Sequence, residues 1–411
     1  MIYDNGQLTE RWAKLIVDQL VKQGVRYFCL SPGSRNTPLL LAVAEHPHVQ
    51  RMVHFDERGM AFHALGFAKA TGIPTVMIVT SGTAVGNLLP AIMEASAAFI
   101  PLVVVTADRP PELRDNGANQ TTDQVKLFAH HVHWSIDLAC PESALSDHYV
   151  ATSIAQAVYR SSHGNKGPVH INVMLREPFF SNASSLPTAS FTTQYESAIS
   201  APSRSTLESW SAQISGIEKG LIVIGSLQPY VSRKPIYELA ETLNWPIFAD
   251  ATSGSRSDGA HCNRISYYES ILKTCPDLKP EAILHFGDRL VSKPLLEWTS
   301  TISTHFYGLI ADHSCRHDPK HIVTRRIECS PSTFCSAILP FIPRSSESCW
   351  LAKWKECSKI VSEHLDTFFA EEPILTEPGI ARWLSSHLTA DWGLFLSNSM
   401  PIRDADNFLF P

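Results

Sequence analysis

Several features that would place a protein in a narrow class are missing from this sequence. Its nine cysteines are an odd number and no two are spaced C-x-x-C, so we expect free thiols in a reducing cytoplasm and not a disulfide framework. The N-terminal residues MIYDNGQLTERWAK contain no apolar core of a signal peptide. The nearest approach to a metal cluster is HHVH, at His130, His131 and His133, which we interpret as solvent-facing loop residues.

A strong charge of either sign is also missing. The chain has 34 Lys and Arg against 40 Asp and Glu, a net charge of −6, so neither nucleic acid nor a membrane surface is indicated as a partner. Residues 88–107 have the length of a membrane span, but Glu94 interrupts them and Pro101 divides them. We interpret this stretch as a buried helix followed by a buried strand.

The spacing of short β-rich runs predicts an α/β fold. At 411 residues the chain is long enough for two to three domains. Helical segments separate the runs, which recur about 25 residues apart, as in βα units on a parallel sheet. The first runs begin at Arg26, Arg51, Thr75 and Pro101, and another covers residues 167–174. We predict one doubly wound domain of buried, apolar strands over residues 1–180.

The remainder of the chain divides into three parts. Residues 181–205 are rich in Ser, Thr, Ala and Pro and are predicted to be a linker. A second α/β domain is predicted over residues 206–344. In residues 345–411 we expect two helices, the second capped by Thr376, and one strand at residues 393–399. A single strand builds no sheet, so this strand either joins a neighbouring sheet or belongs to an incomplete domain.

The loops after the strands carry the candidate ligand contacts, because open α/β sheets bind ligands beyond the carboxyl ends of their strands. SPGSRN presents Ser34 and Arg35, expected to be exposed, just before a helix starting near Thr37, which suits an anion but also an ordinary turn. TSGTAVGN places small residues at a helix start and matches neither G-x-G-x-x-G nor the Walker pattern. A nicotinamide or flavin protein is therefore disfavoured.

Cationic side chains recur in the other loops at strand ends. The long polar loop after the fourth strand contains Arg109, Arg114, Asn119 and Gln120. The second domain offers Arg289 and Lys293, and the last predicted strand leads to Ser399 and Arg403. Any one of these could form a surface ion pair. Together they indicate a site for a small molecule that carries several carboxylates or phosphates.

One acid at a strand-to-helix junction has two interpretations. In HFDERGMAFHALGFAKATG, Glu57 follows Asp56 where an apolar run changes to a small-residue helix. An acid there offsets the positive end of the helix dipole, but the junction is also where α/β folds keep their chemistry.

Four of these segments together closely resemble one enzyme family. SPGSRNTPL, HFDERGMAFHALGFAKATG, TSGTAVGNLLPA and TADRPPELRDNGANQTTDQ occur in this order, as in the 2-succinyl-5-enolpyruvyl-6-hydroxy-3-cyclohexene-1-carboxylate (SEPHCHC) synthases, thiamine-diphosphate enzymes of menaquinone biosynthesis. The resemblance continues through VSKPLLEW and SNSMPIRD and so covers essentially the whole chain. It implies the thiamine-diphosphate-enzyme fold, with residues 1–180 as pyrimidine-binding domain, 206–344 as central domain and 345–411 as the start of a diphosphate-binding domain.

The resemblance also implies roles for individual residues. Glu57 would be the cofactor-activating glutamate, hydrogen-bonded to N1′ of the aminopyrimidine. The enzyme would decarboxylate 2-oxoglutarate and add the resulting unit to isochorismate. Contacts to the cofactor would come from Glu57, Pro32, Gly33 and Thr83. Contacts to isochorismate would come from Ser34, Arg35, Arg109, Asn119 and Gln120, and contacts to substrate or intermediate carboxylates from Lys293, Ser399 and Arg403.

The metal half of the family's cofactor site is not found in these residues. In the family a G-D-G turn and an asparagine hold Mg²⁺, or Mn²⁺, after the strand that matches residues 393–399, and no such motif follows Arg403. We therefore expect the metal site beyond Pro411, and no useful synthase activity from this chain alone. The alternatives are a non-catalytic relic, one subunit of a split enzyme, or another thiamine-diphosphate decarboxylase or carboligase. A complete enzyme is expected to be a cytoplasmic homodimer or homotetramer.

Overall fold

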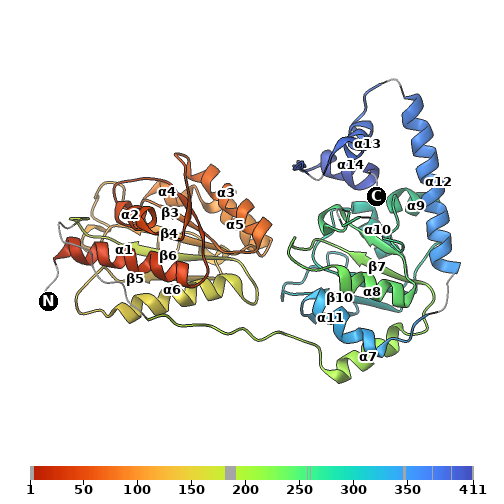
Figure 1. The fold of residues 1–411 in the computed structure, drawn as a ribbon, viewed down its shortest axis with the longest axis horizontal. Coiled ribbons are helices and arrows are strands. Elements are labelled where there is room, and N and C mark those ends of the chain that lie inside the picture. The colour runs from red at the N-terminus through yellow and green to blue at the C-terminus, as the bar shows by residue number, and fades with distance from the viewer. Residues whose placement is uncertain are drawn as a thin grey trace. The chain divides into compact units, whose positions relative to one another are not determined.

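The computed structural model describes residues 4–180, 191–256, 258–259, 261–345, 349–372, 374–389 and 391–409. The chain forms two compact units, Met1–Ala198 and Ile199–Pro411, called here the N-terminal and C-terminal units (Figure 1). Each is described by itself. The finer division into three domains and a linker stays a prediction.

The N-terminal unit contains a sheet of six parallel strands in the order β2-β1-β3-β4-β6-β5. The strands are β1 (Tyr27–Leu30), β2 (Gln50–Val53), β3 (Thr75–Val79), β4 (Leu102–Asp108), β5 (Trp134–Leu138) and β6 (Pro168–Met174). The five predicted strands are confirmed, but the expectation that all are buried is wrong for β2, whose four residues are exposed at the sheet edge. Edge strand β5 was missed because polar Ser135 and Asp137 interrupt its apolar run.

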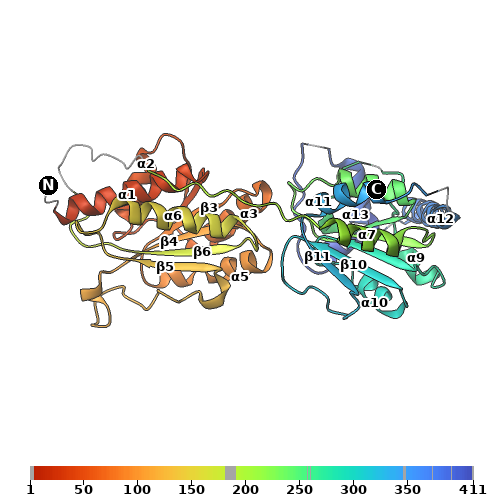
Figure 2. The same ribbon diagram turned by 90° about the horizontal axis from the view of Figure 1, so that it is seen from below.

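Helices cover both faces of this sheet, so the doubly wound prediction is confirmed. One core contains Phe28 and Leu30 of β1 with residues of α1 (Asn5–Lys22), α2 (Thr37–Glu45) and α6 (Asp147–Ser162). A second core, on the opposite face, contains Cys29 with residues of α3 (Glu57–Thr71), α4 (Thr83–Gly86) and α5 (Leu89–Ala97). Figure 2 shows α1 and α6 along one side of the sheet. The loop between β4 and β5 also contains the 3-10 turns η1 (Pro111–Leu113) and η2 (Ala129–His131).

Local chemistry explains where several of these elements begin and end. The Asp4 side chain accepts a hydrogen bond from the Gln7 backbone N–H at 2.8 Å, and the Gln7 side chain accepts one from Asp4, a capping box that starts α1. The chain leaves α1 through Gly24 at φ +94, a conformation that favours glycine. Residues 88–107 form helix α5 and strand β4 as predicted. Among the described helices, none combines the length and the apolar character needed to cross a bilayer.

The C-terminal unit contains a second parallel sheet, of five strands in the order β11-β10-β9-β7-β8. Its strands are β7 (Gly220–Ile224), β8 (Ile247–Ala249), β9 (Ala282–Phe286), β10 (Phe306–Ala311) and β11 (Arg325–Glu328). Edge strand β11 was not predicted, because its RRIE sequence lacks an apolar run. One face packs against α7 (Arg204–Ile214), α8 (Lys234–Leu243) and α11 (Pro331–Ile338), and the other against α9 (Tyr268–Thr274), α10 (Lys293–Thr301) and α12 (Cys349–Glu371).

The last 63 residues, 349–411, begin as part of the core of this second sheet. Trp350 and Trp354 of α12 are buried against it, and Trp350 Nε1 donates a hydrogen bond to the Gly220 carbonyl at 2.8 Å. Thr376 caps α13 (Glu377–His387) as predicted, since its side chain accepts a hydrogen bond from Gly379 N. Beside α13 lies the last helix, α14 (Met400–Phe408) (Figure 1).

The predicted strand at residues 393–399 is wrong. These residues form no strand, and Phe395 in their middle is 94% exposed. An apolar run becomes a strand only where a neighbouring strand satisfies its backbone groups, and no described strand pairs with this segment.

Only part of the predicted linker can be described, because residues 181–190 lie outside the described residues. Residues 191–203 have no regular secondary structure, and α7 begins at Arg204. The first of them lie against the N-terminal unit: Gln19 Nε2 of α1 donates to the Phe191 carbonyl at 2.9 Å. The Tyr195 ring stacks on Tyr159 of α6.

We predict that Gly220→Ala destabilises the C-terminal unit. A Cβ atom at Gly220 would lie 1.8 Å from Cε2 of Trp245, and Trp245 is completely buried with its Nε1 bonded to the Ile217 carbonyl. Overpacking of this kind costs about 1–3 kcal/mol. Urea unfolding followed by tryptophan fluorescence measures the loss. Gly393→Ala is the control, because a Cβ there meets no atom within 4 Å; equal stability of the two variants would contradict the prediction.

Candidate functional site

Glu57 is the first residue of α3, but its side chain does not cap the helix. That role belongs to Asp56, whose Oδ1 accepts hydrogen bonds from the backbone N–H groups of Arg58 at 2.8 Å and Gly59 at 3.1 Å. The bond from Gly59 is the main cause that lowers the pKa of Asp56. Two of the backbone donors that a helix start leaves open are therefore satisfied by Asp56 and not by Glu57.

The Glu57 carboxylate instead joins two loops at the carboxyl ends of the strands. Its Oε1 accepts a hydrogen bond from Ser31 Oγ, directly after β1, at 3.3 Å. Its Oε2 accepts one from Asn87 Nδ2, at the end of α4, at 3.0 Å. The side chain is half-buried, so the carboxylate is held in place and still reachable. Sequence reasoning did not single out Ser31 or Asn87, although both lie inside segments that it quoted.

The loop after β1 is held tightly against β3. Gly33 N donates to Asn36 Oδ1 at 2.9 Å, and Asn36 Nδ2 donates to the Ser31 carbonyl at 2.8 Å. A Cβ atom on Gly33 would lie 2.5 Å from Cβ of Thr80, so only glycine permits this approach. The other predicted contacts from this edge, Pro32, Ser34 and Thr83, are exposed.

Arg35 is buried, which corrects the expectation that it is exposed. Its Nη1 donates to the Leu175 carbonyl at 2.9 Å, and its Nη2 pairs with Glu177 Oε1 at 3.0 Å. The guanidinium also lies over the Phe179 ring. The reason is the chain segment after β6, which passes over the β1 loop and supplies acceptors that the sequence pattern did not reveal. Arg35 thus brings a positive charge to the site, with two of its donors already used.

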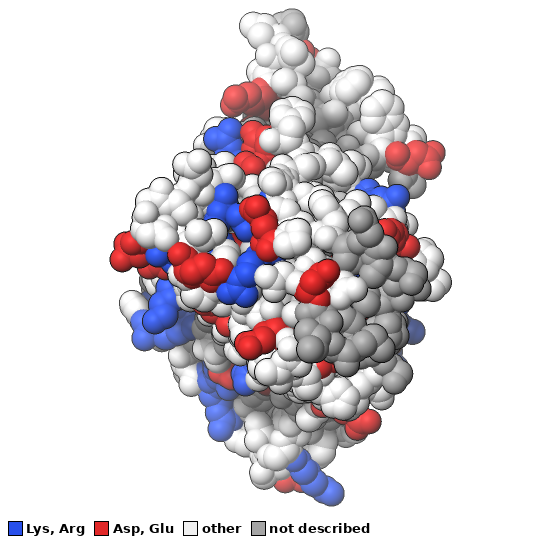
Figure 3. Space-filling view, turned by 90° about the vertical axis from the view of Figure 1, so that its left-hand side faces the viewer, with Lys and Arg blue, Asp and Glu red and all other residues white. Residues whose placement is uncertain are grey.

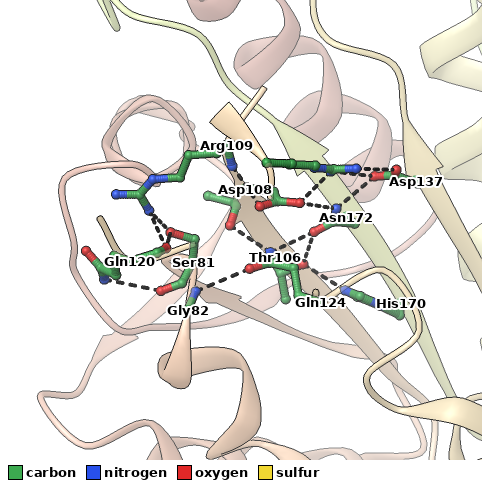
Figure 4. Close-up of polar contacts among 12 residues, drawn as sticks. Ser81, Gly82, Thr106, Asp108, Arg109, Gln120, Gln124, Asp137, His170 and Asn172 are labelled. Carbon is green, nitrogen blue, oxygen red and sulfur yellow. Dashed lines mark hydrogen bonds and ion pairs between the residues drawn. The ribbon is translucent and has the colours of Figure 1, made fainter. Parts of the chain in front are cut away.

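Arg109 and Gln120 are brought together by the loop after β3 (Figure 4). Arg109 Nη1 donates to Ser81 Oγ and, at 2.9 Å, to the Gln120 carbonyl. Gln120 Nε2 donates to the Ser81 carbonyl at 3.2 Å. Burial lowers the pKa of Arg109, and the nearby charge of Arg35 lowers it further. The two positive charges therefore affect one another, while Asn119 is exposed beside Gln120.

A buried polar network on β4 and β6 lies next to the loop after β4, and the sequence did not predict it. Thr106 Oγ1 donates to Asn172 Oδ1 at 2.8 Å and, with its only proton used, accepts from His170 Nε2 at 2.7 Å. Arg114, predicted as a loop cation, instead pairs with Asp108 and with Asp137. The signal was present in the strand GPVHINVM, where His170 and Asn172 alternate on one face of an otherwise apolar run.

The remaining predicted residues lie in the C-terminal unit. Lys293 is the first residue of α10, exposed and 3.5 Å from Glu297. Ser399 precedes α14 at φ +72, and Arg403 is exposed on α14. Within this unit helix α9 connects the start of α10 with α14. It contacts α14 directly, and its Glu269 accepts a hydrogen bond from Ser292, the neighbour of Lys293.

A buried ion pair attaches α14. Arg256 Nη2 lies 2.9 Å from Asp406 Oδ1, and the Tyr268 hydroxyl donates to Asp406 Oδ2 at 2.8 Å. Burial raises the pKa of Asp406 to about 7, Arg256 opposes the rise, and the charges of Asp250 and Glu269 add to it. The raised pKa means that stability from this group is lost as pH rises through about 7.

We predict that Arg256→Met loosens α14 in a pH-dependent way. Without the guanidinium the Asp406 carboxylate has no counter-charge, so the helix should detach more readily at pH 8 than at pH 6, where the carboxyl is protonated. Hydrogen exchange of residues 400–408 at both pH values measures this. Arg204→Met, which removes an exposed pair with Glu208, should leave these amides unchanged. A loosening of equal size at both pH values would contradict the prediction.

Two groups of metal-ligand side chains occur among the described residues, both in the C-terminal unit: Glu241 with His261 and Cys262, and Asp288 with His313 and His317. In the second group, guanidinium nitrogens of Arg326 and Arg289 lie 3.3 and 3.4 Å from the ring nitrogens that face away from Asp288. A metal-bound imidazole needs an acceptor there, and a guanidinium only donates. His317 Nδ1 instead hydrogen-bonds Asp288, whereas His313 Nε2 lies 3.7 Å from the same carboxylate oxygen, and burial lowers the pKa of His313. The predicted HHVH residues belong to neither group.

Comparison with known proteins identifies the family. Residues 10–127 match the N-terminal TPP binding domain of thiamine pyrophosphate enzymes, and residues 188–396 match the thiamine pyrophosphate middle domain. A protein of Rubrobacter xylanophilus named 2-succinyl-5-enolpyruvyl-6-hydroxy-3-cyclohexene-1-carboxylate synthase is 37% identical over 97% of this chain and 71% of its own length. The chain belongs to the SEPHCHC synthase family. Proteins of the same name from Geobacillus thermodenitrificans and Salinibacter ruber are 39% and 34% identical, over 96% and 100% of this chain and 69% and 72% of their own lengths.

The chain therefore belongs to a family of enzymes that use thiamine diphosphate. The matched N-terminal TPP binding domain includes Glu57, the loops after β1, β3 and β4, and Arg109. The predicted fold class and family are therefore confirmed. The comparisons do not test the individual site residues, which remain proposals.

Proposed function

We propose that this protein acts as a SEPHCHC synthase: it decarboxylates 2-oxoglutarate and joins the remaining four-carbon unit to isochorismate, in menaquinone biosynthesis. The observation that carries the proposal is the Glu57 carboxylate, which is held by Ser31 and Asn87 at the strand ends and is not used as a helix cap. When bound, thiamine diphosphate supplies the carbon nucleophile and the electron sink for decarboxylation.

The residues around Glu57 fit the aminopyrimidine half of the cofactor. The carboxylate is held by Ser31 and Asn87, and the side chain is half-buried, so it has a fixed position and is still reachable by a ring nitrogen. We propose that Glu57 hydrogen-bonds the pyrimidine N1′ and moves a proton there. Pro32, Gly33 and Thr83 would line the same surface.

The cationic groups suit substrates that carry two carboxylates each. We propose that Arg35 and Arg109 supply the charge for isochorismate, and that Ser34, Asn119 and Gln120 supply hydrogen bonds. Lys293, Ser399 and Arg403 would contact substrate carboxylates. The chain has a net charge of −6, and on the described part of the face in Figure 3 basic and acidic side chains are interspersed, so the positive charge for the substrates comes from individual side chains.

We further propose a divalent ion, Mg²⁺ or Mn²⁺, as partner of the cofactor diphosphate. Its usual ligands are oxygens, and we assign none of the described residues to it. A cytoplasmic location is supported by the nine cysteines, all of which are free. We also propose a homodimer or homotetramer, on the family resemblance alone.

The proposal is tested by an assay of the purified chain with thiamine diphosphate, Mg²⁺, 2-oxoglutarate and isochorismate. Release of CO₂ from 2-oxoglutarate with consumption of isochorismate would support it. Release of CO₂ from pyruvate instead would favour another thiamine-diphosphate decarboxylase. If calorimetry finds no binding of thiamine diphosphate and the assay no turnover, the proposal is wrong for this chain. The alternatives named from the sequence, a non-catalytic relic or one subunit of a split enzyme, are then favoured.

A further inference from the structure

We propose that Gln124 is a positioning residue that fixes the loops after β3 and β4 relative to each other, and thereby shapes the surface offered to isochorismate. The second part rests on the proposed function. Gln124 is completely buried, so it acts through other residues. It lies in the same loop after β4 that carries Arg109 and Gln120 (Figure 4).

The Gln124 amide makes three hydrogen bonds and uses both of its N–H donors. Nε2 donates to the Ala107 carbonyl at 3.0 Å and to Asn172 Oδ1 at 2.8 Å. Oε1 accepts from the Gly82 backbone N–H at 3.2 Å. One side chain therefore ties β4, β6 and the loop after β3 together.

The orientation of this amide is dictated by its neighbours. Asn172 Nδ2 donates to Asp108 Oδ2 at 2.9 Å and to Asp137 Oδ1 at 2.7 Å, and these carboxylates also pair with Arg114. Because ionised carboxylates only accept, Asn172 must turn its Oδ1 toward Gln124. Position 124 therefore needs a donor toward Asn172 and an acceptor toward Gly82, which a carboxylate cannot provide.

The contact to Gly82 extends the effect to the rest of the candidate site. Gly82 has φ +84 and immediately precedes α4, and Asn87, which directly follows α4, donates to Glu57. On the other side, Gln120 and Arg109 are bonded to Ser81, the neighbour of Gly82. Loss of the Gln124 contacts should therefore loosen both loops.

The test is Gln124→Glu, measured at pH 6 and pH 8. With a rise of about 3 units above the ordinary pKa of about 4.3, as for fully buried carboxyls, the new side chain should be mostly protonated and able to donate once at pH 6. At pH 8 it should be mostly charged, with no donor. We expect residues 109–121 to exchange amide hydrogens at least about ten times faster than in the wild type at pH 8. At pH 6 the difference should be small. Gln213→Glu, an exposed change on α7, adds the same charge as a control.

Isochorismate affinity, measured by calorimetry on the same proteins, gives the second reading. Its carboxylates are ionised throughout this range, so the wild type should bind it equally at both pH values, and the variant at least about ten times more weakly at pH 8. Unchanged exchange at pH 8 would overturn the positioning role. Faster exchange with unchanged affinity would make Gln124 merely structural and overturn its role in the site.

Two further outcomes are distinguishable. If Gln124→Glu does not fold, Gln124→Met, which removes donor and acceptor without adding charge, should loosen residues 109–121 equally at both pH values; no loosening would overturn the proposal. If the wild type itself does not bind isochorismate, the proposed function fails, and the exchange of residues 109–121 alone decides whether Gln124 positions the loops.

Discussion

Replacing Glu57 with glutamine is expected to reduce the decarboxylation of 2-oxoglutarate by about 10²–10⁴-fold, the contribution typical of a positioned proton-transfer group. Glutamine has nearly the same size and can still accept a hydrogen bond from Asn87 Nδ2, which now binds the carboxylate at 3.0 Å. The carboxamide does not, however, exchange a proton with the pyrimidine N1′. Initial rates of CO₂ release at saturating cofactor measure the loss, and the melting temperature should change little.

Asp56 provides the matched control, because the two acids are neighbours with different tasks. Asp56→Ala removes the side chain that accepts from Arg58 N and Gly59 N, so the melting temperature should fall while the rate per folded molecule is kept. If Asp56→Ala lost activity and Glu57→Gln kept it, Glu57 would have no part in the chemistry and the assignment would be wrong.

The sequence pattern predicted the strands that lie inside the sheets better than those at their edges. The runs at β3, β4 and β7 are apolar because both faces are covered by helices. Edge strands β5 and β11 need no such run, and so WSIDL and RRIE were missed. The opposite error occurred at residues 393–399, where an apolar run has no neighbouring strand. Pairing is a tertiary property, and local composition does not determine it.

For the site, the loops were predictable and the contacts inside them were not. Glu57, Arg109 and Gln120 lie at the carboxyl edge of the sheet, as the βα rhythm predicted. Arg35 seemed exposed because nothing near it in sequence contacts it; its partners Leu175 and Glu177 are 140 and 142 residues away. Contacts between loop residues so distant in sequence depend on the sheet order and on the path of the chain after β6, which the spacing of the runs does not give.

His170 should make the N-terminal unit sensitive to acid. It is buried, and this burial lowers its pKa from 6.5 to about 4, against the opposing charge of Asp137. Between these values the unfolded chain binds a proton that the folded unit excludes, so stability present above pH 6.5 is lost as pH falls toward 4. The difference in pKa corresponds to about 3 kcal/mol, a large part of the stability of an ordinary domain.

The stability of the N-terminal unit must be measured separately, because titrating groups of the C-terminal unit change the stability of that unit with pH in opposite directions. There His285 has a pKa lowered to about 4 by burial, whereas Asp406, with its pKa raised to about 7, loses stability as pH rises. The slowest-exchanging amides of β4 and β6, followed at several urea concentrations, report the free energy of opening of the N-terminal sheet.

Substitution of His170 by glutamine separates its contribution from that of the carboxylates. Glutamine is neutral at every pH and can still donate to Thr106 Oγ1, the partner of His170 Nε2. The variant can be less stable than the wild type at pH 8 through imperfect packing, but between pH 6.5 and pH 4.5 its free energy of opening should fall less than that of the wild type. The remaining fall comes from groups such as His46 and His54, whose pKa burial also lowers. His130→Gln, at an exposed position, should keep the wild-type slope. The substitution removes the His170 imidazole and leaves the other titrating side chains in place. If the free energy of opening of His170→Gln fell with pH as steeply as that of the wild type, other groups would cause the acid sensitivity and the prediction would be wrong.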